Sequence, residues 1–346
     1  MKLDISNIPT DSFPITLVNV FSNLQELFVV SYDICCLAIN ALCHPQIQSP
    51  DIFFSCQNIL SNDFIAIVFL LYVFAIIICN IASLRWSVKH LKPVKASLIV
   101  CLNISDITMS LYLLGIFIAH YVYKENEAYV SIVWKKQHLC RFIGASMLIS
   151  TSASSGSTLI IALDRFVCLV WRPFERRGLE PTQIFFSLLT NVAMAVTLPV
   201  VGAVFSSVQI QNTMCVPLGS SVSSIFAWEY ACRSLVLSTC ICVLYILTIV
   251  NLNTSPKITK TRSDNSQVTY RLVSVILTNF VMTSTIMLIT IQSSVSNRRS
   301  ASIEAIISVV VIPANSILNP IINTITTGKN IHSVKVWIKQ KRTHKN

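Results

Sequence analysis

The segment that decides the fold reads Ala162-Leu163-Asp164-Arg165-Phe166-Val167-Cys168-Leu169-Val170-Trp171-Arg172-Pro173. It places an adjacent acid and arginine, Asp164 and Arg165, at the end of a stretch that begins near Phe142 and is otherwise uncharged and largely apolar. Because a charged side chain is costly in hydrocarbon, such a pair is expected at a membrane boundary or facing a protein interior. The segment therefore predicts a helix that crosses a membrane and ends at this pair.

The composition of the whole chain points the same way. Of 346 residues, 53% are hydrophobic and only 12% are charged, whereas soluble domains carry roughly a quarter charged residues. Several charge-poor stretches are long enough to cross about 30 Å of hydrocarbon. These predicted spans are 64–84, 96–118, 142–163, 184–206, 234–252, 272–292 and 303–326. We therefore expect an all-α membrane protein built as a seven-transmembrane helix bundle.

The basic residues predict the orientation of the chain. Lys and Arg concentrate in alternate connecting segments and in the tail, as in residues 85–95 and 329–345. The other segments carry fewer, and Arg233 is counted among them as a residue of the loop before the fifth span. This bias predicts an extracellular N-terminus and a cytosolic C-terminus. The net charge of +11 is then explained by topology and contact with membrane lipids, not by nucleic acid.

Residues 1–34 carry loosely spaced apolar side chains, with Leu24, Leu27 and Val29 expected to point inward. This spacing is similar to the last unit of a leucine-rich-repeat array. One repeat cannot bury its own apolar face, and about three are needed for stability. Either the chain is part of a longer protein, which we favour, or the likeness is due to chance.

Residues 35–61 form a predicted extracellular hinge that is rich in cysteine. Cys35, Cys36, Cys43 and Cys56 lie within it. Four cysteines outside the membrane predict up to two disulfides, with three connectivities that the sequence does not separate. The segment resembles the hinge of leucine-rich-repeat hormone receptors, and the alternative is loop cysteines that pair without any wider meaning.

The motifs together resemble those of one receptor family. Asp164-Arg165-Phe166 is similar to the Asp/Glu-Arg-Tyr signature that closes the third span of rhodopsin-like G protein-coupled receptors. The strongest local match is Val311-Ile312-Pro313-Ala314-Asn315-Ser316-Ile317-Leu318-Asn319-Pro320-Ile321-Ile322-Asn323-Thr324-Ile325-Thr326-Thr327. The likeness runs almost end to end and is closest to the relaxin-receptor branch of the leucine-rich-repeat-containing receptors.

The resemblance implies a division of the chain and a covalent link. Residues 62–328 would form the seven-transmembrane domain, and 329–346 an amphipathic eighth helix with a cytoplasmic tail. It also implies a disulfide between Cys140, which opens the third span, and Cys215 in the loop before the fifth. The alternative is two unrelated thiols.

Asp106 is the only acid inside the second predicted span, and an intramembrane carboxylate is a functional candidate by default. In rhodopsin-like receptors the matching Asp helps to bind a sodium ion. The resemblance places Ser154, Asn315 and Asn319 beside it, and carboxylate, hydroxyl and amide oxygens suit a hard cation. The alternative is a protonated Asp106 that is hydrogen-bonded to the same groups.

The resemblance also implies a switch at the cytoplasmic surface. In the family the arginine matching Arg165 pairs with its acidic neighbour, here Asp164, at rest and moves toward the G protein on activation. Phe166, Asn319 and Pro320 belong to the same set of switch residues.

Several positions depart from the family pattern. Asn323 stands where the Asn-Pro-x-x-Tyr motif has its tyrosine, and Leu189 where the fourth span has tryptophan. In the sixth span Thr283 and Thr285 replace the usual Trp and Pro, and Asn279 replaces the branch's Asp. A helix without proline lacks the defect that makes bending easy.

These features favour a receptor for a peptide or protein hormone that signals through a heterotrimeric G protein at the plasma membrane. The alternative is a protein with the receptor fold that does not signal, such as a decoy or a partner in a receptor dimer. A transporter would need internal repeats or several midplane charges. An enzyme is not expected, because the sequence offers no nucleophile–base pair or metal-ligand set.

Overall fold

The computed structural model describes the parts of the chain that form the bundle and a small sheet. These parts are residues 2–4, 25–29, 42–45, 59–60, 63–123, 134, 138–171, 178–205, 215, 224–254, 273–275, 277–285, 287–288 and 310–325. Cys35, Cys36, Cys56 and the predicted eighth helix at 329–346 lie outside the described residues. The side chain of Cys43 also lies outside them.

Five long helices cover most of the predicted spans. They are α2 (Asp63–His90), α3 (Pro93–Val122), α5 (His138–Phe166), α6 (Pro181–Phe205) and α7 (Ser224–Thr254). Each contains a stretch long and apolar enough to cross a membrane. The sixth span is represented by the shorter apolar helix Val273–Thr285, and the seventh by α10 (Ile312–Ile325).

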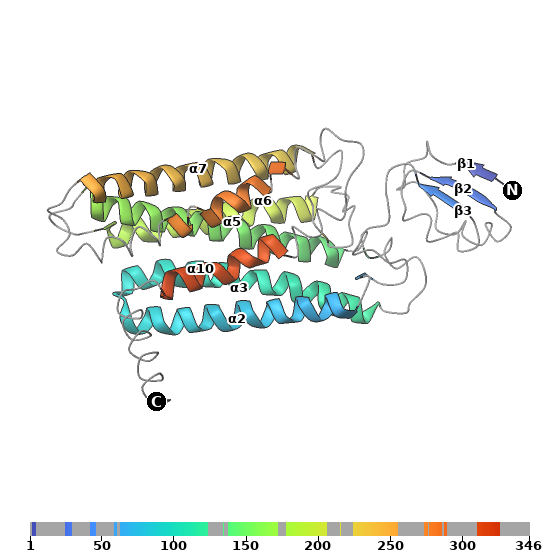
Figure 1. Ribbon diagram of the computed structural model, residues 1–346, viewed down its shortest axis with the longest axis horizontal. Coiled ribbons are helices and arrows are strands. Elements are labelled where there is room, and N and C mark those ends of the chain that lie inside the picture. The colour runs from blue at the N-terminus through green and yellow to red at the C-terminus, as the bar shows by residue number, and fades with distance from the viewer. Residues whose placement is uncertain are drawn as a thin grey trace, which may run out of the picture.

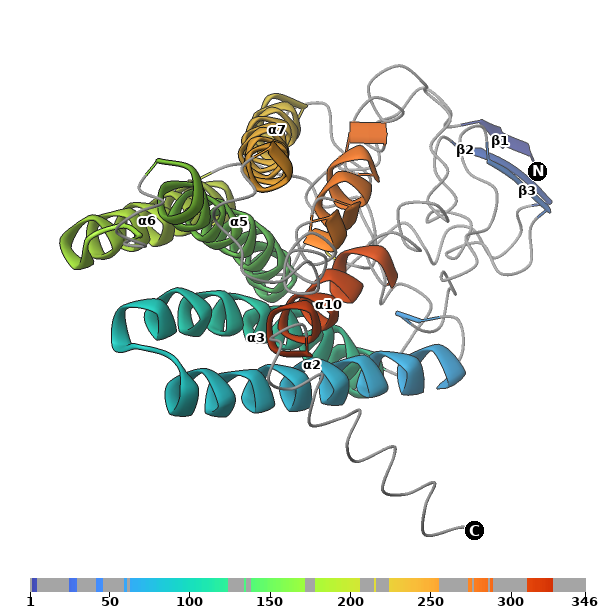
Figure 2. The same ribbon diagram turned by 60° about the vertical axis from the view of Figure 1, so that its left-hand side comes forward.

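The described helices form one bundle in which α3 and α5 are central. Helix α3 packs against α2, α5, α6 and α10, helix α5 packs against α3, α6 and α7, and α10 also packs against α2. Figure 1 shows the long helices running side by side, and Figure 2 shows α10 crossing between α3 and the orange helical segment of the sixth span. The predicted seven-helix membrane fold is confirmed, and the chain is a multi-pass membrane protein.

The surface of the bundle is apolar and its interior is partly polar. Phe64, Leu71, Phe185 and Phe186 are each more than half exposed, as expected for side chains that face lipid. Buried polar residues line the interior instead, among them Asn80, Asn103, Asp106, Ser154 and Asn319. In hydrocarbon a polar group must find a protein partner, so these residues bind one another across helices.

Residues before the bundle form a small parallel sheet. Strands β1 (Lys2–Asp4), β2 (Glu26–Val29) and β3 (Leu42–Pro45) lie in the order β1-β2-β3. Leu27 on β2 is fully buried. Strand β3 lies in the segment that the sequence assigned to the hinge, so the sheet continues past residue 34.

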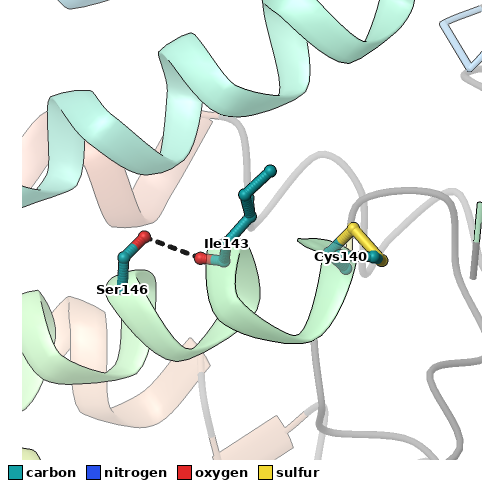
Figure 3. The surroundings of a disulfide bond; sticks show 4 residues. Cys140, Ile143 and Ser146 are labelled. Carbon is teal, nitrogen blue, oxygen red and sulfur yellow. Dashed lines mark hydrogen bonds between the residues drawn. A yellow bond between two sulfur atoms is a disulfide. The ribbon is translucent and has the colours of Figure 1, made fainter. Parts of the chain in front are cut away.

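The predicted disulfide is confirmed. Cys140 in the first turn of α5 is bonded to Cys215, with a Cα–Cα distance of 5.2 Å. Figure 3 shows Cys140 at the beginning of the helix, with Ile143 and Ser146 on the following turns. Both cysteines belong to a large buried apolar cluster, which also contains Trp134 and Tyr230. We call this end of the bundle the disulfide end, and the end that carries Arg165 the Arg165 end.

The disulfide should contribute strongly to stability because it closes a long loop. The two cysteines are separated by 75 residues, and removing such a bridge is expected to cost about 2–5 kcal/mol. Cys140→Ser should therefore lower the melting temperature of the detergent-solubilised protein clearly. Cys232→Ser, which changes an exposed free cysteine, is the control. Equal melting temperatures for the two variants would contradict this assignment.

Candidate functional site

The centre of the bundle holds a polar cluster around Asp106. Its carboxylate on α3 is fully buried and accepts a hydrogen bond of 2.9 Å from the Ser154 hydroxyl on α5. The Asn319 amide nitrogen on α10 lies 3.2 Å from the Asp106 Oδ2 and 3.1 Å from the Ser154 Oγ. Three of the four residues that the sequence grouped thus meet, and they join three helices.

The fourth residue, Asn315, lies one helical turn before Asn319 and so on the same side of α10. Among the described residues, its Oδ1 is buried and has no hydrogen-bond partner. The same holds for the Oδ1 of Asn80, whose amide nitrogen donates to the carbonyls of Ile76 and Ser316. This role of Asn80 was not predicted, although an Asn within an apolar span was visible in the sequence.

The composition of the cluster suits a small hard cation. It supplies a carboxylate and a hydroxyl oxygen, and Asn315 adds a buried amide oxygen without a partner among the described residues. Hard cations prefer such oxygen ligands, and a buried acceptor without a partner calls for an explanation such as an ion or a water. The residues present therefore fit a sodium ion.

At the Arg165 end of the described helices, Asp164 does not form the ion pair with Arg165 that the resemblance implies. Its buried carboxylate accepts the backbone N–H of Leu179 at 3.0 Å. Within the described residues no ion pair joins Asp164 to Arg165, so the expected resting pair is not present. The carboxylate instead holds the chain just before α6, where the helix begins at Pro181.

Gly178 makes this contact achievable. A Cβ built on Gly178 would overlap the Asp164 Oδ1, so a larger residue would displace the carboxylate. The requirement comes from close approach, not from the backbone conformation. In the sequence, the only indication of this role is that a glycine stands shortly before a predicted helix.

The helix that carries Arg165 does not stop at Phe166. It continues as a π-helix over Val167–Trp171, a geometry often found at functional sites. The Asn251 amide nitrogen on α7 lies 3.3 Å from the Leu169 carbonyl, which ties this turn to the end of α7. Trp171 is 74% exposed, and Arg165 and Phe166 are half-buried.

Arg233 was assigned wrongly to a loop. The structure places it inside α7, where one guanidinium nitrogen donates to the Met194 carbonyl of α6 at 2.9 Å and another donates to the Ser152 hydroxyl of α5. Pro199 lies in α6 and lacks an N–H, so the carbonyl of Ala195, four residues earlier, loses its donor within the helix. Arg233 binds the adjacent Met194 carbonyl, and the arginine links three helices.

A second polar contact joins α5 and α6. The Asn191 amide nitrogen donates to the Ala153 carbonyl at 3.0 Å and lies 3.1 Å from the Ser157 hydroxyl. Gly156 permits this approach, because a Cβ there would overlap the Asn191 side chain. Leu189, which occupies the place of the family's tryptophan, is 56% exposed. Asn191, and not Leu189, therefore adds a polar contact to the packing of α6 on α5.

The altered residues of the sixth span face the bundle. Asn279 and Thr283 are buried, and the Asn279 amide donates to the Val275 carbonyl at 2.9 Å. Pro320 on α10 is buried as well, and the side chain of Asn323 lies outside the described residues. The switch roles of Phe166, Asn319 and Pro320 stay predictions.

The Asp164–Leu179 contact can be tested through Gly178. Gly178→Ala should displace the carboxylate and leave a buried acceptor or donor without its partner, which costs about 1–3 kcal/mol. Asp164→Asn keeps an oxygen acceptor and should lower the melting temperature less. The change is measured as thermal unfolding in detergent. A Gly178→Ala variant as stable as the parent would rule out the close contact.

Comparison with known proteins agrees with this architecture. Residues 75–322 match the family described as 7 transmembrane receptor (rhodopsin family). The chain is similar to the G-protein coupled receptor GRL101 of Lymnaea stagnalis, with 27% identity over 327 residues. The match covers 90% of this chain and 29% of that relative, so the chain spans less than a third of the relative's length. Helix arrangement, disulfide and family match lead to one conclusion: the chain belongs to the rhodopsin family of seven-transmembrane receptors.

Proposed function

We propose that the chain is a receptor for a peptide or protein hormone and transmits extracellular binding to a heterotrimeric G protein. The disulfide end would face the outside of the cell and the Arg165 end the cytosol, with the protein in the plasma membrane. The distribution of basic residues along the sequence supports this orientation. The similarity to a G-protein coupled receptor supports the choice of partner.

The single observation that carries the proposal is that Arg165 is not paired with its acidic neighbour among the described residues. Its acidic neighbour Asp164 accepts the Leu179 N–H, and within the described residues no ion pair joins the two side chains. A guanidinium has five donors in a planar fork and prefers carboxylate or carbonyl acceptors. Arg165 at the half-buried end of α5 is therefore suited to bind carbonyls or carboxylates of a cytosolic partner.

The small sheet supports a protein hormone as the ligand. Strands β1 and β2 are parallel and in register from Lys2 to Glu26, a step within the 20–29 residues of a leucine-rich repeat. The next step, from Glu26 to Leu42, is shorter, and terminal repeats are commonly atypical. A repeat array offers a wide concave surface for a folded ligand, in keeping with a relaxin-receptor-like branch.

We also propose that the Asp106 cluster binds a sodium ion. Asp106, Ser154 and Asn315 would hold it through their oxygens, and Asn319, whose amide nitrogen faces the carboxylate, would have to turn its Oδ1 inward to join them. The ion would supply positive charge to a carboxylate that is buried between α3, α5 and α10. The buried Oδ1 of Asn315 supports this proposal, because within the described parts of the chain it has no other partner.

A second candidate is a receptor-fold protein that does not signal, acting as a decoy or as a partner in a receptor dimer. One specific observation favours it. Thr283 is buried in the sixth span where the family has its tryptophan, so the large ring that repacks in relatives is missing. Measurement of guanine nucleotide exchange separates the two candidates.

Replacing Arg165 should abolish G protein activation. Purified chain in lipid nanodiscs is mixed with heterotrimers of the stimulatory and inhibitory classes, and basal guanine nucleotide exchange is measured. Arg165→Ala should lower exchange about tenfold or more, since a charged hydrogen bond contributes about 1.5–3 kcal/mol. Arg85→Ala, an exposed arginine near the same end of α2, is the control. No exchange above empty nanodiscs with the parent chain would favour the non-signalling candidate.

Sodium binding predicts a specific salt effect on stability. A concentration tenfold above the dissociation constant stabilises a protein by about 1.4 kcal/mol, so sodium chloride should raise the melting temperature above that in choline chloride of equal ionic strength. Asp106→Asn should remove this difference, whereas Glu229→Gln, at an exposed acid of α7, should keep it. A sodium effect that persists in Asp106→Asn would show that the ion binds elsewhere.

A further inference from the structure

A buried histidine at the disulfide end connects the bundle to the segment that precedes it. His120 lies in the last turn of α3 and is 1% exposed. Its Nε2 lies 3.2 Å from the Oδ1 of Asp63, in the first turn of α2. Its Nδ1 lies 3.4 Å from the backbone nitrogen of Leu60. One imidazole ring thus contacts two neighbouring parts of the chain through its two nitrogens.

The partners determine the protonation state of the ring. A backbone N–H can only donate, so the Nδ1 that faces Leu60 must be the acceptor. A carboxylate can only accept, so the Nε2 that faces Asp63 must carry the hydrogen. The neutral ring with hydrogen on Nε2 satisfies both contacts. An imidazolium would place an N–H of Nδ1 against the N–H of Leu60.

The Leu60 contact holds an apolar segment in place. Ile59 and Leu60 are both fully buried and belong to the same cluster as Trp134 and the Cys140–Cys215 disulfide. This segment directly precedes α2 and follows the small sheet along the chain. Among the described residues before α2, it is attached directly to the bundle by this contact.

We propose that His120 is a proton-sensitive latch for the Ile59–Leu60 segment. In the latched state the ring carries one proton and Nδ1 is covered by the Leu60 N–H. When the segment leaves, solvent can deliver a second proton to Nδ1, and the resulting imidazolium pairs with the Asp63 carboxylate. The latched form binds fewer protons than the released form, so acidification favours release. This inference does not depend on the proposed function.

Other charged or titratable groups lie at this end of the described helices. They include Tyr121 on α3 and Tyr123 just after it, His138 and Arg141 on α5, and Glu229 and Tyr230 on α7. Tyr121 makes an edge contact with the His120 ring. Asp63 is the acid that contacts His120, and its side chain is 52% exposed. The His120–Asp63 pair is therefore in contact with solvent on the Asp63 side.

Hydrogen exchange at the Leu60 amide measures the latch directly. Full-length chain in detergent is exchanged between about pH 7.5 and about pH 5.5, and the peptide that spans Ile59 and Leu60 is followed by mass spectrometry. Rates are divided by those of the same peptide free in solution, which removes the intrinsic pH dependence. Protection should fall as the pH falls, by up to about tenfold per pH unit for one proton.

Three variants distinguish the latch from a general effect of acid. His120→Gln keeps an acceptor and a donor but does not titrate, so its protection should not change with pH. His138→Gln removes an exposed histidine at the same end and should behave like the parent. Asp63→Asn removes the charge that favours the imidazolium, so release should require a lower pH.

Two results would overturn the proposal. One is protection in the parent chain that does not change with pH. The other is a pH-dependent loss in His120→Gln equal to that of the parent. If His120→Gln does not fold, Asp63→Asn decides: a lower pH of release supports the latch, and an unchanged pH of release contradicts it.

Discussion

The Asp106 carboxylate is fully buried inside the bundle, and it is held there by the Ser154 hydroxyl and the Asn319 amide. A buried ionisable group in a membrane protein is costly unless other groups of the protein bind it. The three residues come from α3, α5 and α10, so satisfying one carboxylate fixes the relative position of three helices. Asn80, which binds the Ser316 carbonyl, adds α2 to the same network.

Helix α5 can pack closely against α3, α6 and α7 because the middle of its buried side is made of small residues. Ser150, Ala153, Ser157 and Gly156 allow neighbouring helices to approach closely, which is how helices associate without a hydrophobic driving force between them. Ser150 donates to the Ser105 carbonyl of α3, and Asn191 of α6 binds near Ser157. The same helix carries Cys140 at one end and Arg165 at the other, so it connects the two ends of the bundle mechanically.

The sequence predicted the elements well and the side-chain contacts unevenly. Long apolar stretches located the five long helices, and the single acid of the second span led to the Asp106 cluster. Arg233 was predicted in a loop, because a cation at the end of an apolar stretch usually marks the end of a membrane span. The structure places it inside α7, where it binds the Met194 carbonyl of α6. That partner cannot be recognised from the sequence. The Asp164–Leu179 hydrogen bond was also not predicted, because its donor is a backbone N–H, which every residue except proline has.

The sixth helix shows how a missing residue changes the physics of the proposed switch. Without proline at Thr285 the helix keeps the hydrogen bond that a proline would remove. Thr285 nevertheless donates from its hydroxyl to the Val281 carbonyl at 2.6 Å, and Thr278 does the same to the Ser274 carbonyl at 3.1 Å. Such back-bonding weakens and bends helices slightly. Among the described residues of the sixth span, two mild tendencies to bend, at Thr278 and Thr285, thus stand where a proline would give one strong kink. In the proposed switch, bending of this helix would be spread over these two positions.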